Sequence, residues 1–148
     1  MSIFWPPAVE TTSPLELVET EIVQRLRTDP YLTTLVDGRV YTAIPPSATY
    51  PLVVIGTTSD MPWPRMRHDG VDALITVRAS SQVRGNWEVH QIADRARGVL
   101  HGVTIEPLGP FRSARLTYAS GAGVYQDDLA GLTTVHRPVL FRVRVTIA

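Results

Sequence analysis

The final segment of the chain, residues 137–147, alternates apolar and polar side chains, and this alternation constrains the fold more than any other feature of the sequence. Its apolar positions are Val139, Phe141, Val143, Val145 and Ile147. Arg142 and Arg144 stand between them. Because successive side chains of a β-strand point to opposite faces, the pattern predicts a strand with one face in a hydrophobic core.

Two helices are predicted from apolar residues at helical spacing. The first begins after Ser13, with Pro14 at the first helical position, and continues to Leu26. The second follows Asn86 as its N-cap and ends before Gly102. Each helix carries one apolar stripe, so each is expected to pack on a sheet.

The remaining apolar segments are predicted to be extended. They are residues 39–41, 52–55, 71–80, 103–105, 111–118 and 137–147. A short helical turn is expected after Asp29, and loops are expected at residues 57–70 and 119–133. This order predicts an α+β fold, a mostly antiparallel sheet of about four to five strands with two α-helices packed on one face.

The length of 148 residues is typical of one domain. We interpret residues 1–13 as a flexible N-terminal arm that carries Ile3, Phe4 and Trp5, and residues 14–148 as a single α+β domain. The chain has no cysteine, which excludes disulfides and thiolate catalysis. No apolar run is long enough to cross a bilayer and no signal peptide is recognised, so a soluble protein without a membrane partner is expected.

The charge is balanced overall but unevenly distributed. The chain has 14 basic residues, all arginine, and 14 acidic residues. Residues 1–37 hold six acids against two arginines, whereas residues 111–148 hold five arginines against two aspartates. Zero net charge argues against general binding of polyanions. The asymmetry is of the kind that head-to-tail association of copies would use, although on charge alone chance clustering on solvated faces is the preferred interpretation.

Residues with catalytic or metal-binding chemistry form no recognisable site. The four histidines include no i, i+4 pair and no H-x-E motif. Asp127 and Asp128 are adjacent, so on a strand they point to opposite sides and cannot work as a carboxylate pair. The sequence therefore predicts no catalytic residue, no cofactor and no metal; an enzyme built around His68 and Asp69 stays an alternative.

Arginines near an aromatic side chain leave a second alternative open. Trp63 beside Arg65 and Arg67 combines a stacking group with cations, and Arg142 and Arg144 form a basic stripe on the last predicted strand. No RNA- or DNA-binding motif accompanies them. A small nucleic-acid-associated protein that uses these Arg-rich faces is the alternative that follows.

The order of these segments resembles a known family. The features that carry the resemblance are the helix at 15–26, the turn Asp37-Gly38-Arg39-Val40-Tyr41, the apolar run 50–55, the helix at 88–100 and the alternating strand at 137–147. Over residues 14–148 the chain resembles the tail completion or tail terminator proteins of long-tailed phages and related prophage elements. It departs from them in its aromatic arm and in the long segment between Ala119 and Thr134.

The resemblance implies a structural virion protein of the head-tail interface. Such proteins form a ring, typically a hexamer, that caps the tail tube, stops its polymerisation and meets the head connector or stopper protein. Genome DNA would pass through the lumen without sequence-specific binding, and no catalysis or cofactor is implied. The expected location is the tail-neck region of the virion, after assembly in the host cytoplasm. Another neck component, such as a head-tail adaptor, a stopper or a tube subunit, is the nearest alternative.

Nine residues are the candidates for assembly contacts. We expect Glu19 or Glu21 of one subunit to pair with Arg142 or Arg144 of the next, since acidic and basic segments lie at opposite ends of the sequence. Contacts with the tube and the connector are expected from two predicted loops. Their candidate residues are Trp63, Arg65, Arg67, Asp127 and Asp128.

Overall fold

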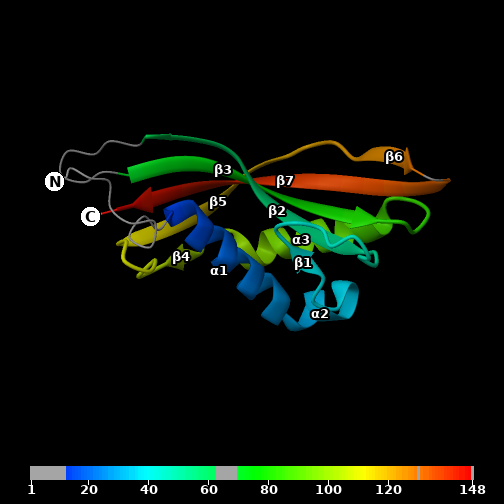
Figure 1. The fold of residues 1–148 in the computed structure, drawn as a ribbon, viewed down its shortest axis with the longest axis horizontal. Coiled ribbons are helices and arrows are strands. Elements are labelled where there is room, and N and C mark those ends of the chain that lie inside the picture. Colours follow the sequence, from blue (N-terminus) through cyan, green and yellow to red (C-terminus); the bar gives the residue numbers. More distant parts are fainter. Residues whose placement is uncertain (1–12, 63–69, 130, 148) are drawn as a thin grey trace.

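The computed structural model describes residues 13–62, 70–129 and 131–147, which form a curled mixed β-sheet with helices on one face (Figure 1). The helices are α1 (Pro14–Thr28), α2 (Pro30–Val36) and α3 (Trp87–Leu100). The strands are β1 (Val40–Tyr41), β2 (Leu52–Pro62), β3 (Gly70–Ser81), β4 (Thr104–Ile105), β5 (Ser113–Gly121), β6 (Tyr125–Leu129) and β7 (Leu132–Thr146).

The sheet has the strand order β1-β2-β3-β7-β5-β4, and β6 pairs with the first part of β7. Strands β3 and β7 form its centre and are antiparallel from the Gly70–Thr146 pair to the Ser81–Val135 pair. β1 runs parallel to β2, and the other neighbours are antiparallel. One long ladder therefore determines which side chains of β7 face the helices.

The core lies between the helices and the odd-numbered positions of β7, as the alternation predicts. Phe141 is fully buried there, together with the apolar residues on either side of it along β7. α1 contributes Val18, Ile22 and Leu26, which lie one turn apart on a single stripe. α3 contributes Val89, Ile92, Ala93, Ala96 and Leu100.

The predicted α+β class is confirmed, but the predicted number of elements and the mostly antiparallel sheet of four to five strands are wrong. The described residues form seven strands, in a mixed sheet, and three helices. β6 lies inside the segment predicted as a loop at 119–133, and β2 continues to Pro62 inside the loop predicted at 57–70. Both segments are polar and largely exposed, so they lack the apolar alternation that marks a half-buried strand; backbone pairing with β7 and β3 orders them instead.

The third helix is the short α2, expected only as a turn. Its seven residues begin with Pro30, whose fixed φ suits the first helical position. Asp37, at φ 50°, and Gly38, at φ 74°, adopt left-handed conformations and end it. Ser13 and Asn86 occupy the predicted N-cap positions of α1 and α3, but neither side chain makes a capping hydrogen bond.

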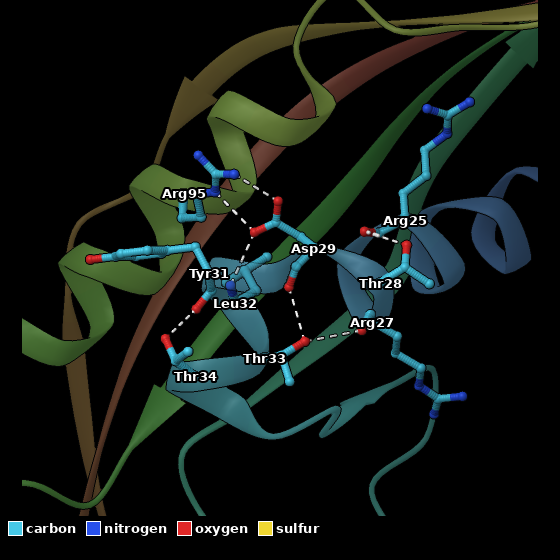
Figure 2. Close-up of polar contacts among 9 residues, drawn as sticks. All are labelled: Arg25, Arg27, Thr28, Asp29, Tyr31, Leu32, Thr33, Thr34 and Arg95. Atoms are coloured by element: carbon cyan, nitrogen blue, oxygen red, sulfur yellow. Dashed lines mark hydrogen bonds and ion pairs between the residues drawn. The ribbon is translucent and has the colours of Figure 1, made fainter.

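Asp29 connects all three helices (Figure 2). It follows α1 directly, and its carboxylate accepts a hydrogen bond from the Leu32 N–H at 3.0 Å, which caps α2. Arg95 of α3 donates to both oxygens of the same carboxylate, from Nε at 2.9 Å and from a terminal nitrogen at 2.7 Å. The Arg95 guanidinium also lies 5.6 Å from the centre of the Tyr31 ring. One side chain thus fixes the angle between α1 and α2 and ties both to α3.

Threonine hydroxyls satisfy the backbone carbonyls around this junction. Thr33 donates to the carbonyls of Asp29 and Arg27, and Thr28 donates to carbonyls in the last turn of α1 (Figure 2). The final carbonyls of a helix have no partner within the helix, so these contacts replace water. The α1–α2 turn is consequently well ordered without a glycine.

We predict that Asp29→Asn lowers the free energy of unfolding at pH 7 by about 1–3 kcal/mol, because it removes a charge-assisted contact to Arg95 and weakens the cap. Hydrogen bonds from Arg95, followed by that from Leu32, hold the pKa of Asp29 below its ordinary value of 3.8. The wild-type contribution is therefore present above pH 3.8 and is lost as the pH falls through the folded-state pKa. Urea unfolding at pH 7 and over an acid series measures both effects.

The matched control is Asp37→Asn, since the Asp37 side chain is 85% exposed and its nearest cation lies at 3.8 Å. We expect that variant to change the free energy of unfolding by less than about 0.5 kcal/mol. Equal stability of Asp29→Asn and the wild type at pH 7 would contradict the role of Asp29.

Candidate assembly surfaces

The face of the sheet that the helices leave open is basic. Even-numbered residues of β7 point to it, and they include Arg142 and Arg144. The register places Arg144 opposite Asp72 of β3 on one side and opposite Arg115 of β5 on the other. The guanidinium groups of Arg142, Arg144 and Arg115 therefore lie close to the Asp72 carboxylate on this part of the sheet.

Asp72 holds two of these arginines. Arg142 donates to both Asp72 oxygens, from Nε at 3.0 and 3.2 Å and from a terminal nitrogen at 2.5 Å, and Arg144 Nε lies 3.6 Å away. The hydrogen bonds from Arg142 keep the pKa of Asp72 below its ordinary value and raise the pKa of Arg142. The Asp72 side chain is 11% exposed and the Arg142 side chain is 47% exposed, so the carboxylate is sheltered while the guanidinium group remains open to solvent.

A shallow groove of about 420 Å³ runs along this basic face. Its lining residues are Thr104, Ser113, Arg115, Thr117, Arg142, Arg144 and Thr146. Arg115 donates to the Thr104 hydroxyl at 3.0 Å, a neutral acceptor. The register places Arg115 directly opposite Arg144, so two like charges lie next to each other along this groove.

The acidic candidates lie on the opposite side of the molecule. Glu19 and Glu21 belong to α1, one of the helices that cover the other face of the sheet. Glu21 pairs with Arg25 at 3.1 Å, and Glu19 accepts a hydrogen bond from the Thr57 hydroxyl. The structure therefore does not bring Glu19 or Glu21 near Arg142 or Arg144 within one chain.

The candidates for axial contacts fall into two groups. Trp63, Arg65 and Arg67 lie outside the described residues, as do His68 and Asp69. Asp127 and Asp128 belong to β6 and not to a loop, since β6 forms a hairpin with β7. Asp127 contacts His136, and Asp128 accepts a hydrogen bond from Thr133 at 2.6 Å.

A buried polar chain, not recognised from the sequence, anchors that hairpin. The Ser80 hydroxyl lies 2.7 Å from His136 Nδ1, and His136 Nε2 lies 2.9 Å from an Asp127 oxygen. Tyr125 stacks on the imidazole with ring centres 4.8 Å apart. The chain links β3, β7 and β6. Ser80 and His136 are 56 positions apart, so no local motif could reveal the contact.

Hydrogen-bonded serine, histidine and aspartate side chains also occur in nucleophilic triads, but the burial of Ser80 and His136 argues for a structural role. Ser80 is 0% exposed and His136 is 5% exposed, so a substrate cannot approach the serine oxygen in this conformation. The described residues contain no cluster of three or more His, Cys, Asp or Glu side chains that could hold a metal ion. No helix in the described part of the chain is long and apolar enough to span a membrane.

These features define a small α+β subunit with an acidic α1–α2 segment on the helix-covered side of the sheet and an arginine-lined groove on the other side. The model of the tail completion protein gp17 family matches residues 20–146, and the chain belongs to that family. It is therefore a structural tail component of the virion, as the resemblance over residues 14–148 predicts. A search of curated proteins finds no match.

One solved structure supports the same fold. It is a chain from the "Virion of native gene transfer agent (GTA) particle", similar with a TM-score of 0.73 over 92% of this chain and 99% of that chain. The two sequences are 18% identical, so the similarity concerns the fold.

We predict that His136→Ala loosens the β6–β7 hairpin, because it leaves Ser80 and Asp127 without their shared partner. The free energy of unfolding should fall by about 1–3 kcal/mol. Amide hydrogen exchange should accelerate in β6 more than in α3. His90→Ala is the control: His90 is exposed on α3 and contacts Arg137 of β7, which lies outside the β6–β7 pairs, so the variant should leave β6 unchanged. Unchanged exchange in β6 after His136→Ala would contradict the anchoring role.

Proposed function

We propose that this protein is a ring-forming tail terminator, which caps the tail tube and joins it to the head connector or stopper. The observation that carries the proposal is the opposite charge of two different faces, within a chain that belongs to a tail completion family. The similarly folded chain from a gene transfer agent virion supports a place in a phage-like particle. The proposed role is architectural and requires neither catalysis nor a cofactor.

Two unlike faces suit a closed ring. A cyclic assembly larger than a dimer joins one patch of each subunit to a different patch of its neighbour. Residues 14–37, which form α1, α2 and their turns, hold five acids against two arginines. The basic groove lies on the opposite side of the sheet, so each subunit offers one face of each sign. Hexameric closure is proposed from the family resemblance.

The proposed contact joins Glu19 or Glu21 to Arg142 or Arg144 of the neighbouring subunit. Arg142 and Arg144 both contact the carboxylate of Asp72, at 2.5 and 3.6 Å. A glutamate of the neighbouring subunit would therefore meet two adjacent guanidinium groups at this point of the face. Glu21 can exchange Arg25 for a new partner at small cost, because an exposed i, i+4 pair contributes only about 0.3–0.5 kcal/mol.

We predict that Glu21→Arg and Arg144→Glu each weaken assembly by at least about tenfold, and that the double reversal restores part of it. Native mass spectrometry of the purified chain measures the distribution of oligomers. Glu106→Arg is the matched control, an exposed acid that directly follows β4, outside α1 and outside the residues that line the basic groove. Rings that persist in both single variants and in the double variant would contradict this pairing.

The alternative of a nucleic-acid-associated protein rests on the three arginines of the basic groove. A chain that stays monomeric and binds DNA with a steep salt dependence would favour it, because phosphate contacts release counterions. Under the terminator proposal the genome passes through the lumen without sequence-specific binding. Weak, sequence-independent DNA binding by a closed ring is therefore the expected result.

Contacts along the axis are proposed for residues 63–67 and for β6. We predict that replacing Trp63, Arg65 and Arg67 together with alanine spares folding and reduces docking onto isolated tails. Asp128→Asn should act in the same direction by removing an exposed charge of β6; among the described residues its carboxylate contacts the Thr133 hydroxyl. Asp127 is left unchanged because it holds His136. Normal tail length and head attachment with both variants would contradict the proposal; circular dichroism verifies folding.

A further inference from the structure

Exposed apolar side chains gather at one end of the sheet. Seven large apolar side chains are exposed among the described residues, and four of them lie in the β3–α3 connection, the start of α3 or the β6–β7 hairpin. These four are Val83 at 39%, Trp87 at 55%, Tyr125 at 44% and Leu132 at 56% exposure. Such a concentration at one site typically marks a contact surface.

Two of the four line a groove, which we name the tip groove. Its volume is about 460 Å³, and it lies between residues 82–85 of the β3–α3 connection and residues 131–135 of β7 and its turn. Val83 and Leu132 line it, together with Val135, which is 3% exposed, and with the polar residues Gln82, Arg84, Gln126 and Thr133. Trp87 lies near it, since a Cβ added to Gly85, which lines the groove, would lie 3.8 Å from Trp87 Cδ1.

The lining also suits the backbone of an extended segment. Gln82 and Gln126 contribute side-chain amides, which can donate to and accept from peptide groups. An apolar peptide with few charges would place its side chains against Val83, Leu132 and Trp87. Because Arg84, Gln82, Gln126 and Thr133 lie beside Val83 and Leu132, the groove suits a short segment that offers both apolar side chains and backbone hydrogen-bonding groups.

The chain itself supplies a segment of this kind. Residues 3–5 read Ile-Phe-Trp, and no charged side chain occurs before Glu10. They precede the described part of the chain, which begins at Ser13. Three consecutive large apolar side chains need a surface to cover them.

The tip groove of the same molecule lies well away from the start of α1. Phe4 lies nine residues before Ser13, so a fully extended chain reaches about 32 Å from it. α1 begins near the C-terminal end of β7 (Figure 1), whereas the residues that line the tip groove lie at the opposite end of that strand. The 15 residues of β7 extend about 50 Å at 3.4 Å per residue. A tip groove on another copy does not require the segment to follow the sheet over this length.

We propose that residues 3–5 of each subunit dock into the tip groove of a neighbouring subunit. The inference rests on the proposed assembly of copies but assigns it a second contact, apolar and independent of the charged faces. The Arg142 and Arg144 face and the tip groove use different residues, so the two contacts can be tested separately.

Photo-crosslinking of the full-length chain tests the proposal. Phe4 is replaced by p-benzoylphenylalanine, and copies with natural isotopes are mixed with ¹⁵N-labelled copies before irradiation. Mass spectrometry should find crosslinks from position 4 to peptides that contain residues 82–87 or 131–135. Pairs of mixed isotope composition identify crosslinks between two chains.

One variant of the tip groove and one control variant outside it complete the experiment. Val83→Asp combined with Leu132→Asp should reduce the crosslink to the tip groove at least about tenfold, because burying carboxylates against apolar groups is unfavourable. Ile44→Asp is the matched control, an apolar residue with 40% exposure outside the groove, and should leave the yield unchanged. Circular dichroism verifies that all variants fold.

Native mass spectrometry of the same samples separates the two proposals. Rings in which position 4 crosslinks elsewhere, or only within one chain, would overturn arm docking and leave the proposed ring intact. Copies that do not associate would overturn both. Mixed-isotope crosslinks to the tip groove that disappear in the double aspartate variant would support arm docking.

Discussion

The antiparallel ladder between β3 and β7 is the constraint on which the rest of the structure depends. It runs from the Gly70–Thr146 pair to the Ser81–Val135 pair, and its pleat sends alternate side chains to opposite faces. One face therefore presents Phe141 and its apolar neighbours to the helices, and the other presents Arg142 and Arg144. A slip of one residue would exchange the two faces, so the buried side chains also fix the position of the charged ones.

The separation of charge on the two sides follows from this arrangement. The helices cover only the apolar face, so the acidic residues of α1 and α2 lie on that side of the sheet. The junction at Asp29 holds that layer together, since its carboxylate caps α2 and binds Arg95 of α3. The surfaces proposed for assembly are consequently rigid parts of the fold, which is what a subunit needs in order to repeat the same contact around a ring.

The sequence predicted the elements that bury an apolar stripe. α1, α3, β3 and β7 all show the required periodicity, and each was located within a few residues. β6 and the second half of β2 were missed because their side chains are polar and exposed, and only pairing with a neighbouring strand reveals them. Among the candidate site residues, Arg142 and Arg144 lie together on one face as alternation requires, whereas their pairing with Asp72 joins positions 70 residues apart and could not be read from the pattern.

The sequence by itself determined the α+β class, the faces of the main helices and strands, and the resemblance to tail completion proteins, since these depend on local periodicity and on the order of segments. The tertiary structure alone decided which polar groups meet. Asp29 with Arg95, Asp72 with Arg142, and Ser80 with His136 each connect residues more than 50 positions apart. Their proximity is set by strand order and register, which bring together side chains whose contact no local sequence pattern indicates.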